Sequence, residues 1–480
     1  MNTRASPHAF VAALCLGIAV ANLARLSPAL ALIAAATVAV GATRGELRPW
    51  LPAAALLLAG WWWGSARLDA LDRSFLLTRV DTSERTRLVV TAPARRSRFQ
   101  MRVPAEVTRF GSFSFREPVL LELPLGRAPP QGALLDTIAT VRLPWPKSHG
   151  FNERTWLRHQ GIHVVLRADQ WRPVGRRGGL GGIADELRAR LARSIAPGLH
   201  GERRGVIEGI VLGDEQALSP ELRQRFRASG LYHLLAVSGQ NVALVAAGAL
   251  ALMWLAGLPR WLGHLTALGA IGGYVLAVGP QPSVVRAGVA GGLASLAWLS
   301  ARAADRWYFL LLGALVLLVW NPYDVLDAGF QLSFAAVAAI FLVVPRLLVA
   351  LDGYPIHPRL ATVVALSSAC GAVTAPILWL QFHALPLVTV PANALAELAV
   401  APLLYLAFTT ALVGALFPPA AAALAWVNGW CAEYLAACAR FFGGLPGAQV
   451  RSDRGALALV CVAGVAAYAW RRWQSSPRST

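Results

Sequence analysis

Polar side chains interrupt several long apolar stretches in the second half of this 480-residue chain. Hydrocarbon makes such residues costly, so they indicate either contacts between helices or a hydrated path through a membrane. Both interpretations are open. The chemistry they suggest is hydrogen bonding to a passing polar or anionic group. The residues predicted to line such a path are His233, Ser238, Gln240, Asn241, Arg286, Asp327, Gln331, Gln381, His383 and Asn393.

The spacing of these residues indicates which of them share a helical face and where a helix breaks. Ser238 and Asn241 are three positions apart and would share one helical face. Their Ser-Gly-Gln-Asn run favours a broken helix, which a membrane tolerates where the freed backbone lines a cavity or is covered by protein. Arg286 either reaches toward the interface or contacts an anion inside the bundle. Asp327 shares a face with Gln331, and pairing with Arg286 is its preferred role.

No residue pattern in the sequence indicates catalysis. The nine histidines form no metal-binding motif, and no G-x-x-x-x-G-K-[ST] loop is present to bind a nucleotide. All five cysteines lie in apolar stretches without a Cys-x-x-Cys pair, which is typical of small buried residues. We therefore expect no cofactor, no metal and no enzymatic activity. The enzymatic alternative would use Asp327, Glu397 and His383.

The composition indicates an integral membrane protein. Hydrophobic residues make up 56% of the chain and charged residues 14%, against about 25% charged residues in soluble domains. The net charge is +19, almost entirely from arginine, because Lys147 is the only lysine. Such an excess of positive charge orients membrane spans, attracts anionic lipid or binds phosphate.

Apolar runs predict about three helices before residue 67 and a larger bundle after residue 230. The first runs, at 9–23, 29–42 and 51–66, are expected to be retained transmembrane helices rather than a cleaved signal peptide. Residues 231–473 predict about eight to ten spans, followed by a polar tail at 474–480. The expected bundle helices are 231–257, 261–278, 283–301, 307–320, 328–350, 360–380, 386–416 (one or two segments), 420–442 and 455–470.

Residues 67–178 have the character of a soluble insertion. Short alternating runs separated by Pro/Gly-rich turns predict a small β-barrel, with the OB fold as the leading candidate. The next segment, 179–230, predicts connecting helices, and a basic amphipathic one at Ile183–Ala196 would lie on the bilayer surface or on the β domain. The fold class is thus a polytopic α-helical membrane protein with an inserted small OB-like barrel. The predicted strands are Leu88–Ala92, Phe99–Thr108, Ser114–Leu123, Thr137–Leu143 and Ile162–Ala168.

Several ordered sequence blocks resemble the ComEC competence family. Residues 212–242, LGDEQALSPELRQRFRASGLYHLLAVSGQNV, are similar to its most recognisable signature. Residues 150–162, GFNERTWLRHQGI, are similar to the end of its N-terminal soluble domain. One departure is Gln240-Asn241, which stands where many relatives have Leu-His, so the role of that histidine does not carry over. Further blocks are Pro282–Ala287, Asn321–Phe334, and Gln381–His383 with Asn393.

The resemblance implies a channel that moves one DNA strand across the cytoplasmic (inner) membrane during natural transformation, with the soluble domain outside. It implies as partners single-stranded DNA, the lipid bilayer, a DNA receptor, a cytosolic motor and other competence proteins, and assembly into an oligomer is open. Many family members carry a C-terminal metallo-β-lactamase-like domain that this sequence lacks, so nuclease activity is expected either to come from a separate protein or to be absent. The alternative function is a transporter of small anions or lipid-linked metabolites.

If the soluble domain collects a DNA strand, its arginine and aromatic residues are the expected contacts. Arginine pairs with phosphate, and a base stacked on an aromatic ring contributes about 1–3 kcal/mol. The aromatic residues would alternatively fill the barrel core, and the alternative transporter would not need this surface. The predicted contacts are Arg95, Arg96, Arg98, Phe99, Arg109, Phe110 and Arg116.

Overall fold

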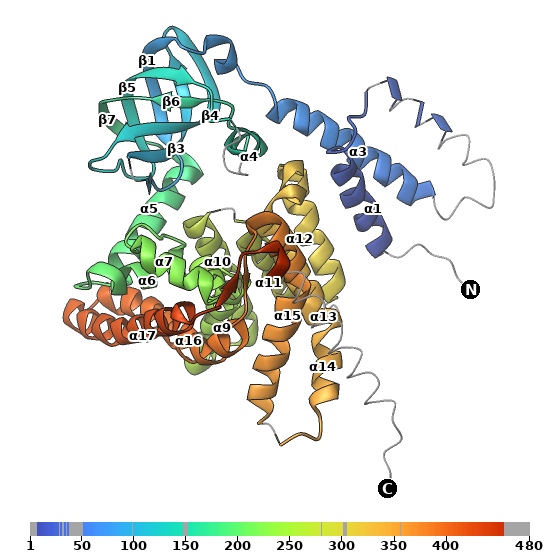
Figure 1. The fold of residues 1–480 in the computed structure, drawn as a ribbon, viewed down its shortest axis with the longest axis vertical. Helices are drawn as coiled ribbons and strands as arrows, with labels where there is room; N and C mark the ends of the chain where they lie inside the picture. The colour runs from blue at the N-terminus through green and yellow to red at the C-terminus, as the bar shows by residue number, and fades with distance from the viewer. Residues whose placement is uncertain are drawn as a thin grey trace. The chain divides into compact units, whose positions relative to one another are not determined.

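Two compact units divide the chain in a computed structural model. Unit 1 contains residues 1–194 and 237–330, and unit 2 contains residues 195–236 and 331–480. The elements are mostly helices, together with one small β-barrel (Figure 1), as the predicted fold class requires. The structure describes residues 7–27, 29–30, 33–34, 36–37, 51–97, 99–146, 152–279, 281–300, 305–355 and 357–455.

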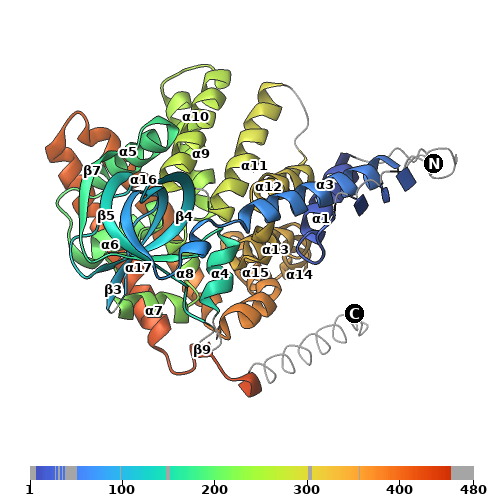
Figure 2. The same cartoon turned by 90° about the horizontal axis from the view of Figure 1, so that it is seen from above.

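The β-barrel of unit 1 is a closed ring of five strands. Each strand hydrogen-bonds to the next around the ring, and the last pairs back with the first. Figures 1 and 2 show the strands curled around a common centre. Counted along the chain, the ring order is 1-2-3-5-4, the Greek-key connectivity of an OB fold. In ring order the strands are β1 (Ser83–Val90), β3 (Gln100–Phe110), β4 (Phe113–Pro124), β6 (Val165–Arg167) and β5 (Ala133–Arg142).

Alternation along the strands fills the barrel. In β3, every second residue from Met101 to Val107 is buried, because successive side chains point to opposite faces of a strand. This period predicts the ring strands from sequence. Two further strands lie outside the ring: β2 (Arg95–Arg96) pairs with β3, and β7 (Trp171–Arg176) pairs with β5. Apolar alternation does not predict β7, because five of its six residues are exposed. Its Pro173 is typical of an edge strand.

Two helices whose full bounds fall in the described residues precede the barrel. α1 (Pro7–Val20) and α3 (Leu51–Leu71) pack so closely that a Cβ at Gly17 would overlap the carbonyl oxygen of Leu57. Small residues that let backbones touch are typical of helix pairs in membranes. The expected middle helix, 29–42, lies largely outside the described residues.

One helix links the barrel to the helices of unit 1. In α5 (Gly179–Ser194), Asp185 accepts hydrogen bonds from Arg177 at 2.5 and 2.7 Å and from Gln131 at 2.8 Å. Farther along α5, Leu187 lies against Gly273. The amphipathic segment therefore packs on the β domain and on a neighbouring helix, which favours the second of its two predicted placements.

The remaining elements are helices with short connections. Within unit 1 they are α4 (Glu153–His159), the 3₁₀ turns η2 (Leu76–Arg79) and η3 (Pro322–Leu326), α9 (Gly239–Leu255), α10 (Arg260–Val278), α11 (Pro282–Leu299) and α12 (Arg306–Trp320). Unit 2 holds α6 (Gly201–Leu212), α7 (Pro220–Ala228), α8 (Tyr232–Leu235), α14 (Val344–Leu351), α15 (Pro358–Phe382), α16 (Thr389–Gly414), α17 (Pro418–Gly444) and a ribbon of β8 (Leu385–Pro386) and β9 (Gln449–Val450). α13 (Ala328–Leu342) begins at the boundary between the units.

Three described helices are long and apolar enough to cross a membrane: α10, α15 and α16. A fourth span is possible if α13 and α14, which meet at 41°, count as one. The apolar helices α1, α9 and α12 are shorter than the roughly 20 residues a bilayer core needs. The larger number of expected spans stays a prediction, and the expected helix at 455–470 lies outside the described residues.

Candidate polar pathway and nucleic-acid interface

The chain breaks where the Ser-Gly-Gln-Asn run predicts. α8 ends at Leu235, and α9 begins at Gly239 after Ser238, whose backbone is extended. The predicted broken helix is therefore confirmed in the described residues. Gln240 follows in the first turn of α9 and is half-buried.

Hydrogen bonds at this break hold neighbouring helices together. Ser238 Oγ donates to Asn241 Oδ1 at 3.2 Å, and Asn241 Nδ2 donates to the hydroxyl of Tyr274 in α10 at 3.5 Å. At the start of α11, Ser283 Oγ donates to the carbonyl of Val237 at 2.7 Å. Asn241 is only 2% exposed. These contacts favour the helix-contact interpretation for Asn241, and its role in lining a path stays a prediction.

Two arginines lie at helix ends of unit 1, Arg286 at the start of α9 and Arg188 at the end of α10. The guanidinium of Arg286 lies so close to Gly239 that a Cβ there would be 3.0 Å from its Nη2 atom. The buried Arg188 of α5 donates to the carbonyls of Ala277 and Val278 at 3.1 and 3.3 Å. It thereby satisfies carbonyls left open at the C-terminus of α10. Nothing in the sequence pattern predicts this role, because Arg188 falls outside the apolar stripe of an amphipathic helix.

Asp327 lies directly before α13. Its Oδ1 atom accepts a hydrogen bond from the backbone N–H of Phe330 at 3.0 Å, so the carboxylate caps the helix. The predicted pairing with Arg286 stays a prediction.

In unit 2, two predicted residues from separate sequence blocks meet. Gln331 lies at the start of α13 and Gln381 near the end of α15, and Gln381 Nε2 donates to Gln331 Oε1 at 3.3 Å. The next predicted residue, His383, ends α15 with a left-handed φ of 49°. Its exposed ring meets Trp379 edge-on at 5.9 Å. This end of unit 2 therefore carries three of the predicted side chains.

Two predicted residues of unit 2 make other contacts. Asn393 of α16 donates to Ser367 Oγ in α15 at 3.4 Å, which is a contact between helices. His233 is exposed in α8, and its Nδ1 lies 2.9 Å from the carbonyl of Gly230. The ten predicted lining residues divide equally between the two units. Their convergence on one path stays a prediction.

The predicted nucleic-acid contacts of the barrel lie at the two ends of β3. Arg95, Arg96 and Phe99 are exposed in the loop between the first two ring strands, and Phe99 is 79% exposed. OB folds use this loop in binding oligonucleotides. Arg109 and Arg116 are exposed near the turn at the other end of the 11-residue strand, about 30 Å away at the usual rise per residue. The predicted contact Arg98 lies outside the described residues.

Phe110 is a correction to the predicted interface. It is 2% exposed in the barrel core, so its ring is not available to stack on a base. In the pairing of β3 with β1, Arg87 lies opposite Arg109 and the next residue, Leu88, lies opposite Val107, so β3 carries one extra residue here and Phe110 turns inward. Phe113 instead is 43% exposed. The guanidinium of Arg79 lies 5.0 Å over the centre of the Phe113 ring. No sequence motif predicts this arrangement.

A polar network joins four distant segments of unit 1. The carboxylate of Asp72, just after α3, accepts hydrogen bonds of 2.9 and 2.7 Å from Arg158 of α4. It also accepts bonds from Arg25 at 2.7 Å and from the hydroxyl of Tyr323 at 2.9 and 3.0 Å. Burial alone raises the pKa of Asp72, but the bonds from these three residues hold it well below its usual range. His159 of α4 stacks on Tyr323 at 4.6 Å.

Comparison with known proteins gives the family. The sequence model of the family described as "Competence protein" matches residues 210–476, more than half of the chain. ComE operon protein 3 of Bacillus subtilis is 31% identical over 197 residues, covering 40% of this chain and 24% of that protein. Competence protein ComA of Neisseria gonorrhoeae is 30% identical over 262 residues, covering 51% and 36% of the two chains. The uncharacterized protein YcaI of Escherichia coli is 32% identical over 146 residues, covering 28% and 19%.

These alignments span well under half the length of each relative. No solved structure matches the chain. The apolar helices long enough to span a bilayer and the family match together identify a membrane protein. The ordered blocks, the OB-type barrel and the match over residues 210–476 place the chain in one family. It belongs to the ComEC-type competence proteins.

Proposed function

We propose that this chain conducts single-stranded DNA across the cytoplasmic membrane during natural transformation, with its barrel on the outer side. One combination carries the proposal: a helical region matching the competence family and, in the same chain, an OB-type barrel with an exposed arginine and phenylalanine loop. The name of one relative, competence protein ComA, associates that protein with competence.

The physics of the substrate sets the demands on the protein. Each nucleotide carries one negative charge, so a strand crosses a bilayer only along a hydrated, polar route. Outside the membrane, arginines bind the phosphates and exposed aromatic rings stack on bases. Within unit 2, the hydrogen-bonded pair of Gln331 and Gln381 offers neutral polar groups that do not repel the strand. A DNA receptor delivers the strand, and a cytosolic motor pulls it.

The experiment follows labelled duplex DNA in cells that lack the gene. We expect DNA to remain bound at the surface while the nuclease-protected, internalised fraction disappears, and the wild-type gene to restore it. Normal internalisation in the deletion strain would overturn the proposal. A change in small-anion flux with unchanged DNA uptake would instead favour the transporter alternative.

A matched pair of variants tests the path itself. Replacing both Gln331 and Gln381 with leucine removes two polar groups that touch each other in unit 2. We expect this variant to reach the membrane and to internalise little DNA. The control is Gln216→Leu, which makes the same chemical change at an exposed position in a loop. Equal uptake by the two variants would remove Gln331 and Gln381 from the path.

A further inference from the structure

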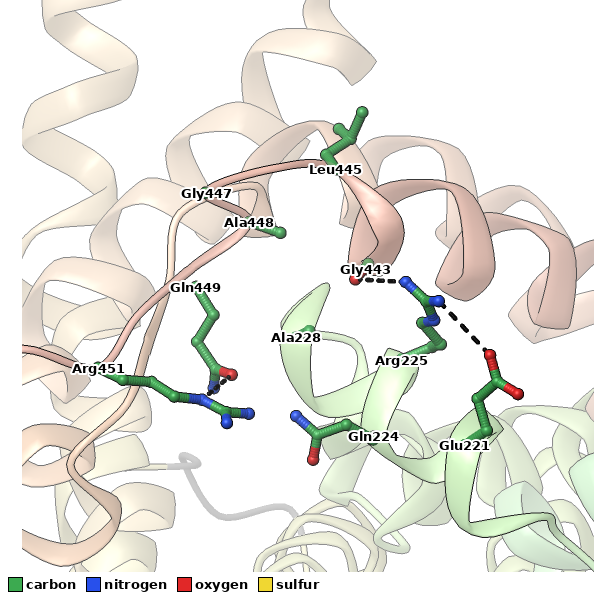
Figure 3. A pocket seen from close by; sticks show the side chains of 10 residues that line it. All are labelled: Glu221, Gln224, Arg225, Ala228, Gly443, Leu445, Gly447, Ala448, Gln449 and Arg451. Atoms are coloured by element: carbon green, nitrogen blue, oxygen red, sulfur yellow. Dashed lines mark hydrogen bonds and ion pairs between the residues drawn. The ribbon is translucent and has the colours of Figure 1, made fainter.

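Unit 2 contains a pocket that none of the predicted path residues lines. It has a volume of about 410 Å³ and opens between α7, the C-terminal end of α17 and β9. Figure 3 shows the side chains of Gln224, Gln449 and Arg451 pointing into one hollow. The pocket lies inside the region that matches the competence family.

Close packing of backbone builds the wall of this pocket. A Cβ at Gly443 would overlap the carbonyl oxygen of Arg225, so a glycine at the end of α17 lets α7 approach it. Arg225 Nη1 donates to the carbonyl of Gly443 at 3.2 Å, and its Nη2 pairs with Glu221 at 3.4 Å. The pairing of β8 with β9, which sets Pro386 opposite Gln449, fixes the other side. Arg225 and Glu221 thus offset each other's charge within a built wall.

The remaining side chains set the chemistry of the pocket. Arg451 Nε donates to Gln449 Oε1 at 3.0 Å. In the part of the chain that the structure describes, the terminal amino groups of Arg451 and the carboxamide of Gln224 make no bond to protein. With Glu221 offset by Arg225, the lining carries one net positive charge and several hydrogen-bond donors. Guanidinium groups bind phosphate oxygens in a fixed forked geometry, and carboxamides add donors without adding charge.

We propose that this pocket binds a phosphodiester. A phosphodiester carries a single negative charge, which one uncompensated arginine neutralises, whereas a phosphate monoester would leave charge in excess. The volume exceeds that of the phosphate group and leaves room for its two ester substituents. The same chemistry occurs in the backbone of a nucleic-acid strand and in a phospholipid headgroup. The nucleic-acid source rests on the proposed function, and the lipid source does not.

The experiment measures binding of two soluble probes to the full-length purified chain in detergent. One probe is an abasic deoxyribose-phosphate hexamer, and the other is glycerophosphoglycerol. We expect Arg451→Gln to weaken binding of at least one probe about tenfold, since one charge-assisted contact is lost. For the hexamer, the slope of log affinity against log salt should fall by about 0.7. Gln224→Leu, an exposed substitution on α7, should weaken the same probe.

The matched control is Arg454→Gln, which removes the same charge three residues away from an exposed side chain outside the pocket. Loss of hexamer binding in Arg451→Gln alone identifies a strand subsite, and loss of glycerophosphoglycerol binding identifies a headgroup subsite. Failure of both probes to bind, or equal losses in Arg451→Gln and Arg454→Gln, would overturn the proposal. These binding results do not depend on DNA uptake in cells, so the pocket proposal and the proposed function can be disproved independently of each other.

Discussion

The pKa of Asp324, in the polar turn between α12 and α13, lies well above the usual range of an aspartate. Burial and the neighbouring charge of Asp327 raise the pKa of Asp324 to about 7, although a hydrogen bond with Asn321 opposes them. An unfolded aspartate titrates near 3.9. The folded state therefore keeps a proton that the unfolded state loses between about pH 4 and 7. The stabilising effect of protonation is complete below about pH 4 and is lost as the pH rises through about 7.

The Asp324→Asn variant tests this assignment. The asparagine carboxamide stays neutral at every pH. The free energy of unfolding of the variant should therefore not fall between about pH 4 and 8, whereas that of the wild type should fall by on the order of a few kcal/mol. Thermal unfolding of the purified protein at several pH values measures the difference. Asp352→Asn, at an exposed carboxyl group, serves as the control. Parallel pH profiles for Asp324→Asn and wild type would contradict the assignment.

Variants of Asn241 and Tyr274 test whether Asn241 serves helix packing or lines the path. A hydrogen bond between helices in a membrane contributes about 0.5–1.7 kcal/mol. We expect Asn241→Leu and Tyr274→Phe each to lower stability, and the double variant to lose less than the sum of the two. Strictly additive losses would show that the 3.5 Å contact contributes nothing. DNA uptake that falls while stability is unchanged would instead support the predicted path role of Asn241.

At the scale of elements, the Asp72 network ties the helices of unit 1 to α4, whose Leu157 packs against Leu120 and Val165 of the barrel. Removing the carboxylate in Asp72→Ala takes away the anion that Arg25 and Arg158 share. Because Arg158 is half exposed, solvent screening limits the cost to about 1–2 kcal/mol. We expect hydrogen exchange to rise in α4 and η3, which the network joins, and to stay slow in the barrel core.

A control within the barrel makes this test specific. Asp136→Ala removes a carboxylate that Arg87 contacts at 2.7 Å, but both partners lie on adjacent barrel strands. It should leave exchange in α4 and η3 unchanged. The pKa of Asp72 is held below its usual range, so its ion pairs persist at any pH above about 4 and weaken only as the pH falls further. Equal exchange in the two variants would contradict the role of Asp72.

The elements that the sequence predicts correctly are those set by the pattern of neighbouring residues. Alternation gives the ring strands, and continuous apolar runs give helices such as α10, expected at 261–278 and found at Arg260–Val278. The Ser-Gly-Gln-Asn run gives the break before α9, because its residue types act locally. Partners far apart in sequence do not follow from such signals. Tyr323 and Asp72 are 251 residues apart, and only the folded chain brings them together.

The burial of Phe110 shows a second limit of local pattern. Strict alternation would turn Phe110 outward if Val107 faces inward, since they are three residues apart. In its pairing with β1, β3 carries one extra residue between Val107 and Arg109, and this bulge reverses the expectation. A bulge depends on the pairing of two strands, so β3 read by itself does not reveal it.

At the scale of the whole molecule, the family match and the barrel are independent observations. The match covers residues 210–476, whereas the barrel strands lie between Ser83 and Arg176. The barrel is therefore assigned by its strand connectivity and not by the match. The net charge of +19 attracts a polyanion from any direction. Under the proposed function, the placement of particular arginines decides where a strand is held.

Salt dependence tests that placement in the full-length chain. Each phosphate contact of a single strand adds about 0.7 to the slope of log affinity against log salt. We expect Arg95→Gln with Arg96→Gln to lower this slope by about 1.4 for an oligothymidylate, because both exposed side chains lose their phosphates. Phe99→Ala should weaken binding by about 1–3 kcal/mol at every salt concentration and leave the slope unchanged, because stacking releases no counterions.

Arg142→Gln with Arg172→Gln is the matched control, since it removes two exposed arginines from other strands of the same domain. The total charge changes equally in the two double variants. If the molecule bound DNA through its overall charge alone, both would lower the slope equally, and the loop before β3 would have no special role. A larger fall for Arg95 and Arg96 requires that the strand lies along this loop, because counterions are released only where phosphate and arginine meet.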